Sequence, residues 1–346
     1  MVIYHLEQCT YSLIYDKTAK LEYFLVDEND DIEAIYATKL NSINYHTKLG
    51  FIEYAENKFG IVNLGLQSRV QEGSKVILQM TWSGDKNKQP KFTQDIKLVG
   101  RYVILTKKFK NPIFAKTINN KDRLEEMVRK YSNYGMIFRS IVNDLEELNF
   151  VEDEIKDLIN KFEQLTEKNL KVLFPMKLLA GTPKYLQLLR NLANSGSIEI
   201  VTNNKEVFTL IGKYTSLWKL KPIIYHPEYV VDITTIKNQI LEKDIQNESF
   251  KLEIHQLSGI NLIDVNGYNK QLDFYKINYL AIDTIVWHIK LRDLTGIILI
   301  DFIKNMSATQ QLKLTEKITQ LLQDDWRHSK TLGFSNAGIF ELIRNK

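Results

Sequence analysis

Apolar and polar residues alternate along most of residues 1–105, with the period of two that is typical of half-buried β-strands. Two such runs, 11–15 and 20–26, are joined by Asp16-Lys17-Thr18, which predicts a hairpin. Further strands are expected over 34–40, 49–54, 60–64, 75–80 and 98–105. Many short strands with turns between them are typical of a small barrel, and the OB-fold is the usual barrel for single-stranded nucleic acid.

The period changes after Lys121, where apolar residues recur at helical spacing. A helix over 121–131 is followed by a strand over 135–140 and by a charged amphipathic helix over 147–165. Residues 170–240 then alternate between helix and strand, which implies a mixed or parallel sheet. The expected segments are helix 185–192, strand 197–201, helix 205–213 and strand 222–225. The pattern as a whole predicts an α+β or mixed α/β multidomain chain.

Residues 241–346 contain two strands of similar design. The apolar run 297–300 predicts a strand buried on both faces, which ends on Asp301 at the exposed carboxyl end of the strand. Residues 259–266 repeat this design with Asp264. Two such strands could bring paired carboxylates to one sheet edge and bind a divalent metal. From spacing alone, however, two strand-end caps are the better interpretation.

Composition and charge set broad limits. The chain has 346 residues, enough for two or more cores, and 46 basic residues against 42 acidic ones give a mildly basic net charge of +4. Cys9 is the only cysteine, which excludes an intrachain disulfide and a Cys-x-x-Cys zinc site. Neither a signal peptide nor a membrane-length apolar run is visible, so a cytoplasmic protein is expected. His255, His288 and His328 are scattered and are expected to be structural.

Four segments carry a resemblance to the ribonuclease E/G family. They are Leu262-Ile263-Asp264-Val265-Asn266, Lys290-Leu291-Arg292-Asp293-Leu294-Thr295-Gly296, Asp301-Phe302-Ile303 and Phe340-Glu341-Leu342-Ile343-Arg344. The match is strongest over 240–346 and weaker toward the N-terminus. The resemblance implies an RNase H-like subdomain in two parts (1–31 and 170–240), an inserted OB-fold RNA-binding barrel (32–105), a 5′-sensor region (106–169) and a DNase I-like catalytic subdomain (241–346).

The resemblance also implies an activity, an endoribonuclease that hydrolyses phosphodiester bonds of single-stranded, AU-rich RNA. It would act in RNA processing, including that of ribosomal RNA, and in RNA decay. Asp264 and Asp301 would hold one Mg²⁺, and Asn266 would orient one of them by hydrogen bonding. The catalytic residues expected from the resemblance are therefore Asp264, Asp301 and Asn266.

Four residues are expected to contact RNA through the same resemblance. Phe51 matches an aromatic residue that stacks on bases, although a place in the barrel core is equally favoured. A second family aromatic falls at Ile61, with Phe59 close by. Lys88 matches one basic position of a loop over 84–91, which could equally be a solvated hairpin tip. Arg139 and Ser140 match residues that hold a 5′-monophosphate, and the alternative for Arg139 is a surface ion pair.

Two departures from the family pattern support a rival hypothesis. The loop over 267–271 is shorter than in the family, and Lys304 or Asn305 stands where the family has a second acid. A catalytically weakened RNA-binding protein that retains the family fold is therefore the alternative. Retention of Asp264, Asp301 and Asn266 favours the enzyme.

Assembly is the last expectation. The family joins protomers through a zinc ion shared by short cysteine motifs that follow the catalytic domain, whereas this chain ends at Lys346 and has only Cys9. A structural zinc takes four ligands. We therefore expect no zinc-linked dimer, and a monomer or an apolar dimer stays possible.

Overall fold

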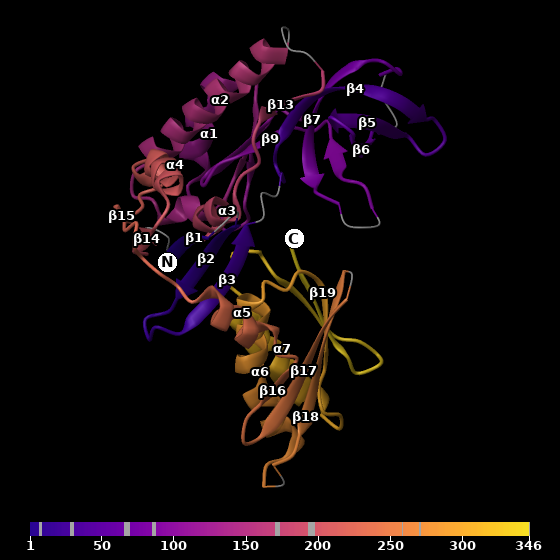
Figure 1. The fold of residues 1–346 in the computed structure, drawn as a ribbon, viewed down its shortest axis with the longest axis vertical. Coiled ribbons are helices and arrows are strands. Elements are labelled where there is room, and N and C mark those ends of the chain that lie inside the picture. Colours follow the sequence, from indigo (N-terminus) through magenta and orange to yellow (C-terminus); the bar gives the residue numbers. More distant parts are fainter. Residues whose placement is uncertain are drawn as a thin grey trace. The chain divides into compact units, whose positions relative to one another are not determined.

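The structure is a computed structural model that describes residues 1–6, 9–27, 31–65, 70–84, 88–169, 174–192, 198–257, 259–269 and 271–345 (Figure 1). The chain has a mixed α/β fold, as the alternating patterns predict, and it divides into two compact units. The first unit comprises Met1–Glu28, Asn191–Gly212 and Lys221–Lys346, and the second comprises Asn29–Arg190 and Lys213–Leu220.

The first unit contains a five-stranded sheet with the order β15-β14-β1-β2-β3. Its strands are β1 (Val2–Leu6), β2 (Cys9–Tyr15), β3 (Leu21–Asp27), β14 (Ile200–Thr202) and β15 (Ile223–Tyr225). The predicted hairpin is confirmed, since β2 pairs with β3 and an Asp16 carboxylate oxygen accepts the N–H groups of Thr18 and Lys20. The predicted βα alternation is also confirmed, because α4 (Lys205–Thr215) lies between the parallel strands β14 and β15, with α5 (Ile233–Leu241) after them.

The same unit contains a mixed six-stranded sheet with the order β16-β17-β18-β19-β21-β20. Its strands are β16 (Asp244–Gln246), β17 (Phe250–Leu257), β18 (Ile260–Gly267), β19 (Gly296–Asp301), β20 (Lys330–Phe334) and β21 (Phe340–Arg344). One face packs on α6 (Phe274–Leu291) and α7 (Ala308–Leu321) in a continuous apolar core (Figure 1). The Ser307 and Gln310 side chains form a reciprocal capping box that fixes the start of α7.

The second unit contains a closed five-stranded barrel, which confirms the predicted small barrel. Strand β4 (Ile35–Asn44) is long enough to pair with β7 through its first half and with β5 through its second half, so the sheet closes. The order around the barrel is β4-β5-β6-β8-β7, and β13 (Met176–Leu179) adds to β4 outside it. The other barrel strands are β5 (Leu49–Ala55), β6 (Lys58–Asn63), β7 (Lys75–Trp82) and β8 (Lys91–Thr93).

In its described residues the second unit also contains a four-stranded sheet and three helices. The sheet order is β11-β12-β10-β9, with β9 (Lys97–Val99), β10 (Val103–Thr106), β11 (Ile113–Phe114) and β12 (Gly135–Phe138). The helices are α1 (Lys121–Val128), α2 (Asn149–Asn169) and α3 (Lys184–Asn191), with the 3₁₀ turns η1 (Arg129–Tyr131) and η2 (Ser140–Asp144).

The single strand expected over 98–105 is wrong. Strands β9 and β10 are separate there and pair with each other in antiparallel register. The chain turns between them because the buried Glu154 carboxylate accepts the N–H groups of Arg101, Tyr102 and Val103. A Cβ atom at Gly100 would lie 2.4 Å from that carboxylate, so the turn needs a glycine there. Within the described segments, no helix is long and apolar enough to cross a membrane.

Candidate functional site

Asp264 and Asp301 lie side by side in the six-stranded sheet. Strands β18 and β19 run parallel, and the two aspartates are direct partners in their register. Asp301 is the last residue of β19, as expected, but Asp264 lies inside β18 and not at its end. The reason is that the antiparallel pairing of β18 with β17 continues as far as Gly267.

Both aspartates lie on the face of the sheet that the helices leave open. Ile263, Ile298 and Ile300 point into the helix-covered core. Because side chains alternate along a strand, Asp264 and Asp301 point to the opposite face. The expectation that 297–300 is buried on both faces is therefore wrong, since Ile297 is 44% exposed. The hydrophobic run reflects one covered face together with apolar residues on the open face.

The predicted hydrogen bond from Asn266 is present. Its side-chain nitrogen donates to one oxygen of Asp264 over 2.6 Å. Asn266 is two residues beyond Asp264, so both side chains lie on the same face of β18. This bond fixes the orientation of the carboxylate, and no other described residue occupies its second oxygen.

Asp301 carries an unsatisfied oxygen. Its Oδ1 atom is buried and has no hydrogen-bond partner among the described residues. Leaving a buried acceptor without a partner costs about 1–3 kcal/mol, and more for a charged group. An oxygen of this kind, directly beside a second carboxylate, fits a hard cation with oxygen ligands.

A pair of neighbouring carboxylates is a donor set that Mg²⁺ can accept. This ion keeps several waters and is commonly bound through one or two carboxylates. Within the described part of the chain, no cluster of three or more His, Cys, Asp or Glu side chains could hold a metal ion. The donor set available on the open face is therefore the pair Asp264 and Asp301, which suffices for Mg²⁺ with water in its remaining positions.

A third acidic residue, Glu253, lies beside the two aspartates across the strands, and the sequence did not predict it. Glu253 on β17 is the register partner of Asp264. Its carboxylate accepts a hydrogen bond from Lys251 over 2.8 Å, and Lys251 also pairs with Asp244 at 3.2 Å. The hydrogen bonds from Lys251 to Glu253 and Asp244 raise the pKa of the lysine, which keeps a positive charge beside the aspartates. Only the strand register shows this proximity, because residues 251–253 carry no distinctive motif.

Of the histidines expected to be structural, His288 is buried and His255 is exposed. His288 is buried in α6, and burial followed by the charges of Arg292 and Lys20 lowers its pKa to about 3. It is therefore neutral and fits the structural role that was expected. His255 is 45% exposed on the open face, near Glu253, so it is not part of the core.

The barrel places Phe51 on its outer surface. Phe51 is 37% exposed, whereas Ile52, the next residue of β5, is fully buried in the barrel interior. The alternative of a core role for Phe51 is therefore wrong. Phe51 pairs in register with Ile61, and Phe59 nearby is 49% exposed.

Further polar and aromatic side chains continue this outer row. Ile61 is the register partner of Lys91, and Lys91 is the register partner of Trp82. The ammonium group of Lys91 lies 5.4 Å from the centre of the Trp82 ring. Lys88 is exposed in the preceding loop, of which residues 85–87 lie outside the described part of the chain. The alternation of exposed residues along β6–β8 could have signalled Phe59 and Lys91, whereas their alignment with Phe51 needs the strand register.

Arg139 and Ser140 follow strand β12. Ser140 is exposed, and the Arg139 guanidinium donates to the Gly100 carbonyl over 3.0 Å. Burial, followed by the charge of Arg190, lowers the pKa of Arg139 to about 10, so it remains a cation at neutral pH. Arg139, Ser140, Phe51 and Lys88 belong to the second unit, whereas Asp264, Asn266 and Asp301 belong to the first.

Comparison with known proteins gives one consistent result. Residues 97–346 match the Ribonuclease E/G family. Ribonuclease E of Synechocystis sp. is 25% identical over 79% of this chain and 44% of its own length. A Ribonuclease E/G-like protein of Pyropia yezoensis is 23% identical over 79% of this chain and 58% of its own. Ribonuclease G of Escherichia coli strain K12 is 22% identical over 80% of this chain and 60% of its own. The chain thus spans about half the length of these relatives.

Proposed function

The chain belongs to the ribonuclease E/G family, and from this membership we propose that it is a Mg²⁺-dependent endoribonuclease acting on single-stranded RNA. The observation that carries the proposal is the pair Asp264 and Asp301, whose carboxylates are register partners on an open sheet face. The buried Oδ1 of Asp301, which has no hydrogen-bond partner among the described residues, would be stabilised by a bound cation.

The residues of the site have distinct roles in this proposal. Asp264 and Asp301 hold the metal, and Asn266 keeps the Asp264 carboxylate in a fixed orientation. A bound Mg²⁺ supplies polarisation of the scissile phosphate and a lowered pKa of its bound water.

The barrel provides the second contact with RNA. Its strand order, with β6 and β8 the parallel pair, supports assignment as an OB-fold, in which the second and third strands bind oligonucleotides. Phe51 and Phe59 lie on these two strands and offer exposed rings on which bases can stack. Lys88 and Lys91 add positive charge for phosphates. The preference for AU-rich RNA, and roles in processing of ribosomal and other RNA and in decay, are proposed from the family resemblance.

Arg139 and Ser140 are proposed to receive the 5′-monophosphate of the substrate. The cationic guanidinium of Arg139 is largely desolvated, which strengthens its attraction for a phosphate. Ser140 is exposed beside it and can donate its hydroxyl. The same family resemblance assigns an RNase H-like subdomain to the five-stranded sheet and a DNase I-like one to the six-stranded sheet.

One observation favours the rival function, an RNA-binding protein with weakened catalysis. Strand β18 ends at Gly267 and helix α6 already begins at Phe274, so the connection beside the aspartates is short. A short connection offers few side chains to hold RNA over the metal.

A cleavage assay distinguishes the two functions. Purified protein and its Asp301→Asn variant are incubated with a 5′-monophosphorylated, AU-rich oligonucleotide, with Mg²⁺ or with EDTA. Internal cleavage that requires both Mg²⁺ and Asp301 supports the endoribonuclease. RNA binding without cleavage by the unmutated protein supports the rival.

A further inference from the structure

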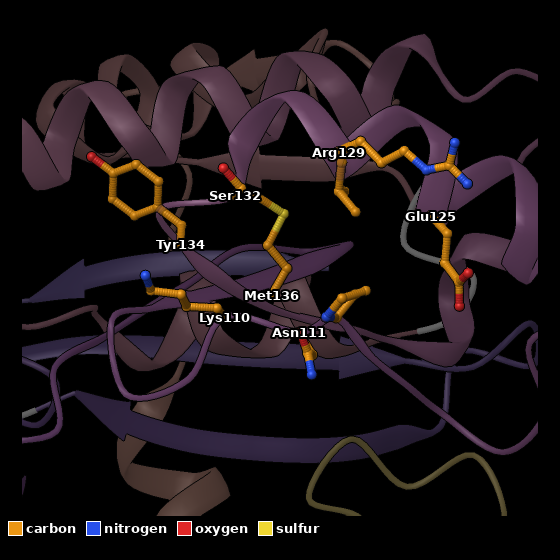
Figure 2. Close-up of a pocket in the computed structure, with 9 residues that line it drawn as sticks. Lys110, Asn111, Glu125, Arg129, Ser132, Tyr134 and Met136 are labelled. Carbon is orange, nitrogen blue, oxygen red and sulfur yellow. The ribbon is translucent and has the colours of Figure 1, made fainter.

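A pocket in the second unit has features of a nucleotide site, and none of Phe51, Lys88, Arg139 and Ser140 lines it. Its volume is about 450 Å³, within the range of roughly 300–1,000 Å³ for small-molecule sites. Helix α1, turn η1, strand β12 and the segment before β11 surround it. Figure 2 shows Lys110, Ser132 and Tyr134 at one end, Met136 in the middle, and Arg129 with Glu125 at the other end.

The middle of the pocket is apolar. Val128, Met136 and Pro112 line it; the first two are almost fully buried, and Pro112 is half-buried. The thioether of methionine makes favourable contacts with aromatic rings. A flat ring of a ligand therefore has a fitting surface here.

The first end of the pocket suits an anion. Lys110 is exposed and forms no ion pair among the described residues, so its charge is available. Ser132 is exposed beside the same space and can donate its hydroxyl. The Tyr134 hydroxyl is already bonded to Glu163 at 3.2 Å, and the ammonium group of Lys107 lies 5.4 Å from the Tyr134 ring centre, which holds this wall in place. A phosphate group at this end would meet one ammonium and one hydroxyl donor.

The second end combines a carboxylate with a guanidinium. Glu125 and Arg129 lie four residues apart on the α1–η1 segment, yet within the described chain neither forms an ion pair. A carboxylate can accept two parallel N–H bonds, and guanine offers such a pair at N1 and N2. Arginine donates to the O6 and N7 acceptors of the same base. Adenine has no pair of adjacent N–H donors of this kind.

We propose that this pocket binds a guanine nucleotide, with the phosphate at Lys110 and Ser132, the base over Met136, and the base edge at Glu125 and Arg129. The nucleotide can be free or a residue of an RNA strand, because both present the same base and phosphate. The proposal does not depend on the metal site, since Asp264 and Asp301 take no part in it.

Calorimetric titration of the full chain with GMP, AMP and UMP tests the proposal. We expect GMP to bind with a dissociation constant below about 1 mM, and AMP and UMP to bind about tenfold more weakly or not at all. The variants Lys110→Gln and Glu125→Gln each weaken GMP binding about tenfold, the effect of losing a hydrogen bond to a charged group. The matched controls Lys116→Gln and Glu126→Gln, at exposed positions outside the pocket, leave it unchanged.

Two further measurements distinguish free GMP from RNA as the ligand, and distinguish failure of this proposal from failure of the proposed endoribonuclease activity. A short RNA with a 5′-phosphorylated guanosine that displaces GMP identifies RNA as a ligand, whereas GMP binding that such RNA does not disturb identifies the free nucleotide, and either result supports the site. Asp301→Asn keeps GMP binding even if RNA cleavage is never observed. Absence of GMP binding, equal binding of AMP, or equal losses in pocket and control variants would overturn the proposal.

Discussion

Strand β19 has aspartates near both of its ends. Those near its start form ion pairs with arginines (the satisfied end), whereas Asp301 at its carboxyl end has no such partner among the described residues (the unsatisfied end). At its start, Gly296 is the register partner of Arg344, whose side chain is fully buried. Arg344 donates to Asp325 at 2.7 and 2.9 Å and to Asp293 at 2.9 Å. Arg327 donates to Asp293 at 2.6 and 2.5 Å, so two cations offset two carboxylates.

The other end of the strand lacks such compensation. Asp301 stands beside Asp264, and in the described part of the chain neither carboxylate forms an ion pair. Among the described residues, the side-chain donor bonded to this pair is the neutral Asn266. Both clusters consist of aspartates at one sheet. Asp293 and Asp325 are neutralised by arginines and are structural, whereas Asp264 and Asp301 lack such partners among the described residues and can bind a ligand.

The largest effect is expected at the unsatisfied end. Asp301→Asn should lower RNA cleavage by roughly 10³-fold or more, because the loss of a charged metal ligand removes several kcal/mol of transition-state stabilisation. The free energy of unfolding should fall by no more than about 1 kcal/mol, since within the described residues the Asp301 Oδ1 atom has no hydrogen bond to lose. Cleavage rates and urea unfolding measure both quantities, with Asp324→Asn as an exposed control. Near-normal Mg²⁺-dependent cleavage by the variant would contradict the metal site.

At the satisfied end, a substitution should lower stability and leave the Mg²⁺ dependence of cleavage unchanged. Arg344→Met leaves Asp325 buried without its cation and takes one cation from Asp293, and breaking a buried ion pair in this way costs about 3–5 kcal/mol. Urea unfolding should show this loss, while the Mg²⁺ concentration for half-maximal cleavage stays the same in the folded fraction. If Arg344→Met were as stable as the unmutated protein, the difference between the two ends would not hold.

Asn266 tests whether orientation matters at the unsatisfied end. Asn266→Ala removes the bond to Asp264 but leaves both carboxylates in place. Loss of such an orienting partner typically costs about 10–100-fold in metal affinity or activity. We expect cleavage to fall by that factor and the half-saturating Mg²⁺ concentration to rise. A lower rate with unchanged Mg²⁺ dependence would mean that Asn266 acts on the RNA and not on Asp264.

The barrel surface should respond differently from the sheet. Phe51→Ala and Phe59→Ala should each weaken binding of single-stranded RNA by about 1–3 kcal/mol, the usual value of one base–aromatic stack. The Mg²⁺ dependence of cleavage should not change. Phe208→Ala, which removes a 37% exposed ring of helix α4, is the control in a filter-binding titration. Equal affinities for all three variants would show that bases do not stack on the barrel.

Much of the fold, and one residue of the candidate site, could be predicted from local sequence patterns. The hydrophobic period predicts the hairpin, the barrel strands and the helices, and Asp301 stands out because a carboxylate ends an apolar strand. The place of Asp264 inside β18, the approach of Glu253 and the exposure of Ile297 depend on which strands pair. Strand pairing joins residues that are far apart in the sequence, so the hydrophobic period along the chain does not predict which strands pair. The partners of Arg344 were missed for the same reason.

The smallest expected effect concerns the buried, neutral imidazole of His288 in α6. Burial lowers its pKa to about 3, against an ordinary value of 6.5, so below pH 6.5 the unfolded chain takes up a proton that the folded chain does not. Stability should therefore fall as the pH is lowered from 7 to 5, by about 1–2 kcal/mol from this residue. In His288→Gln this part of the slope should vanish, whereas His46→Gln, at an exposed turn, should keep it. Chemical unfolding at several pH values measures the slope. If both variants lost stability with pH as the unmutated protein does, a group other than His288 would be responsible for the slope.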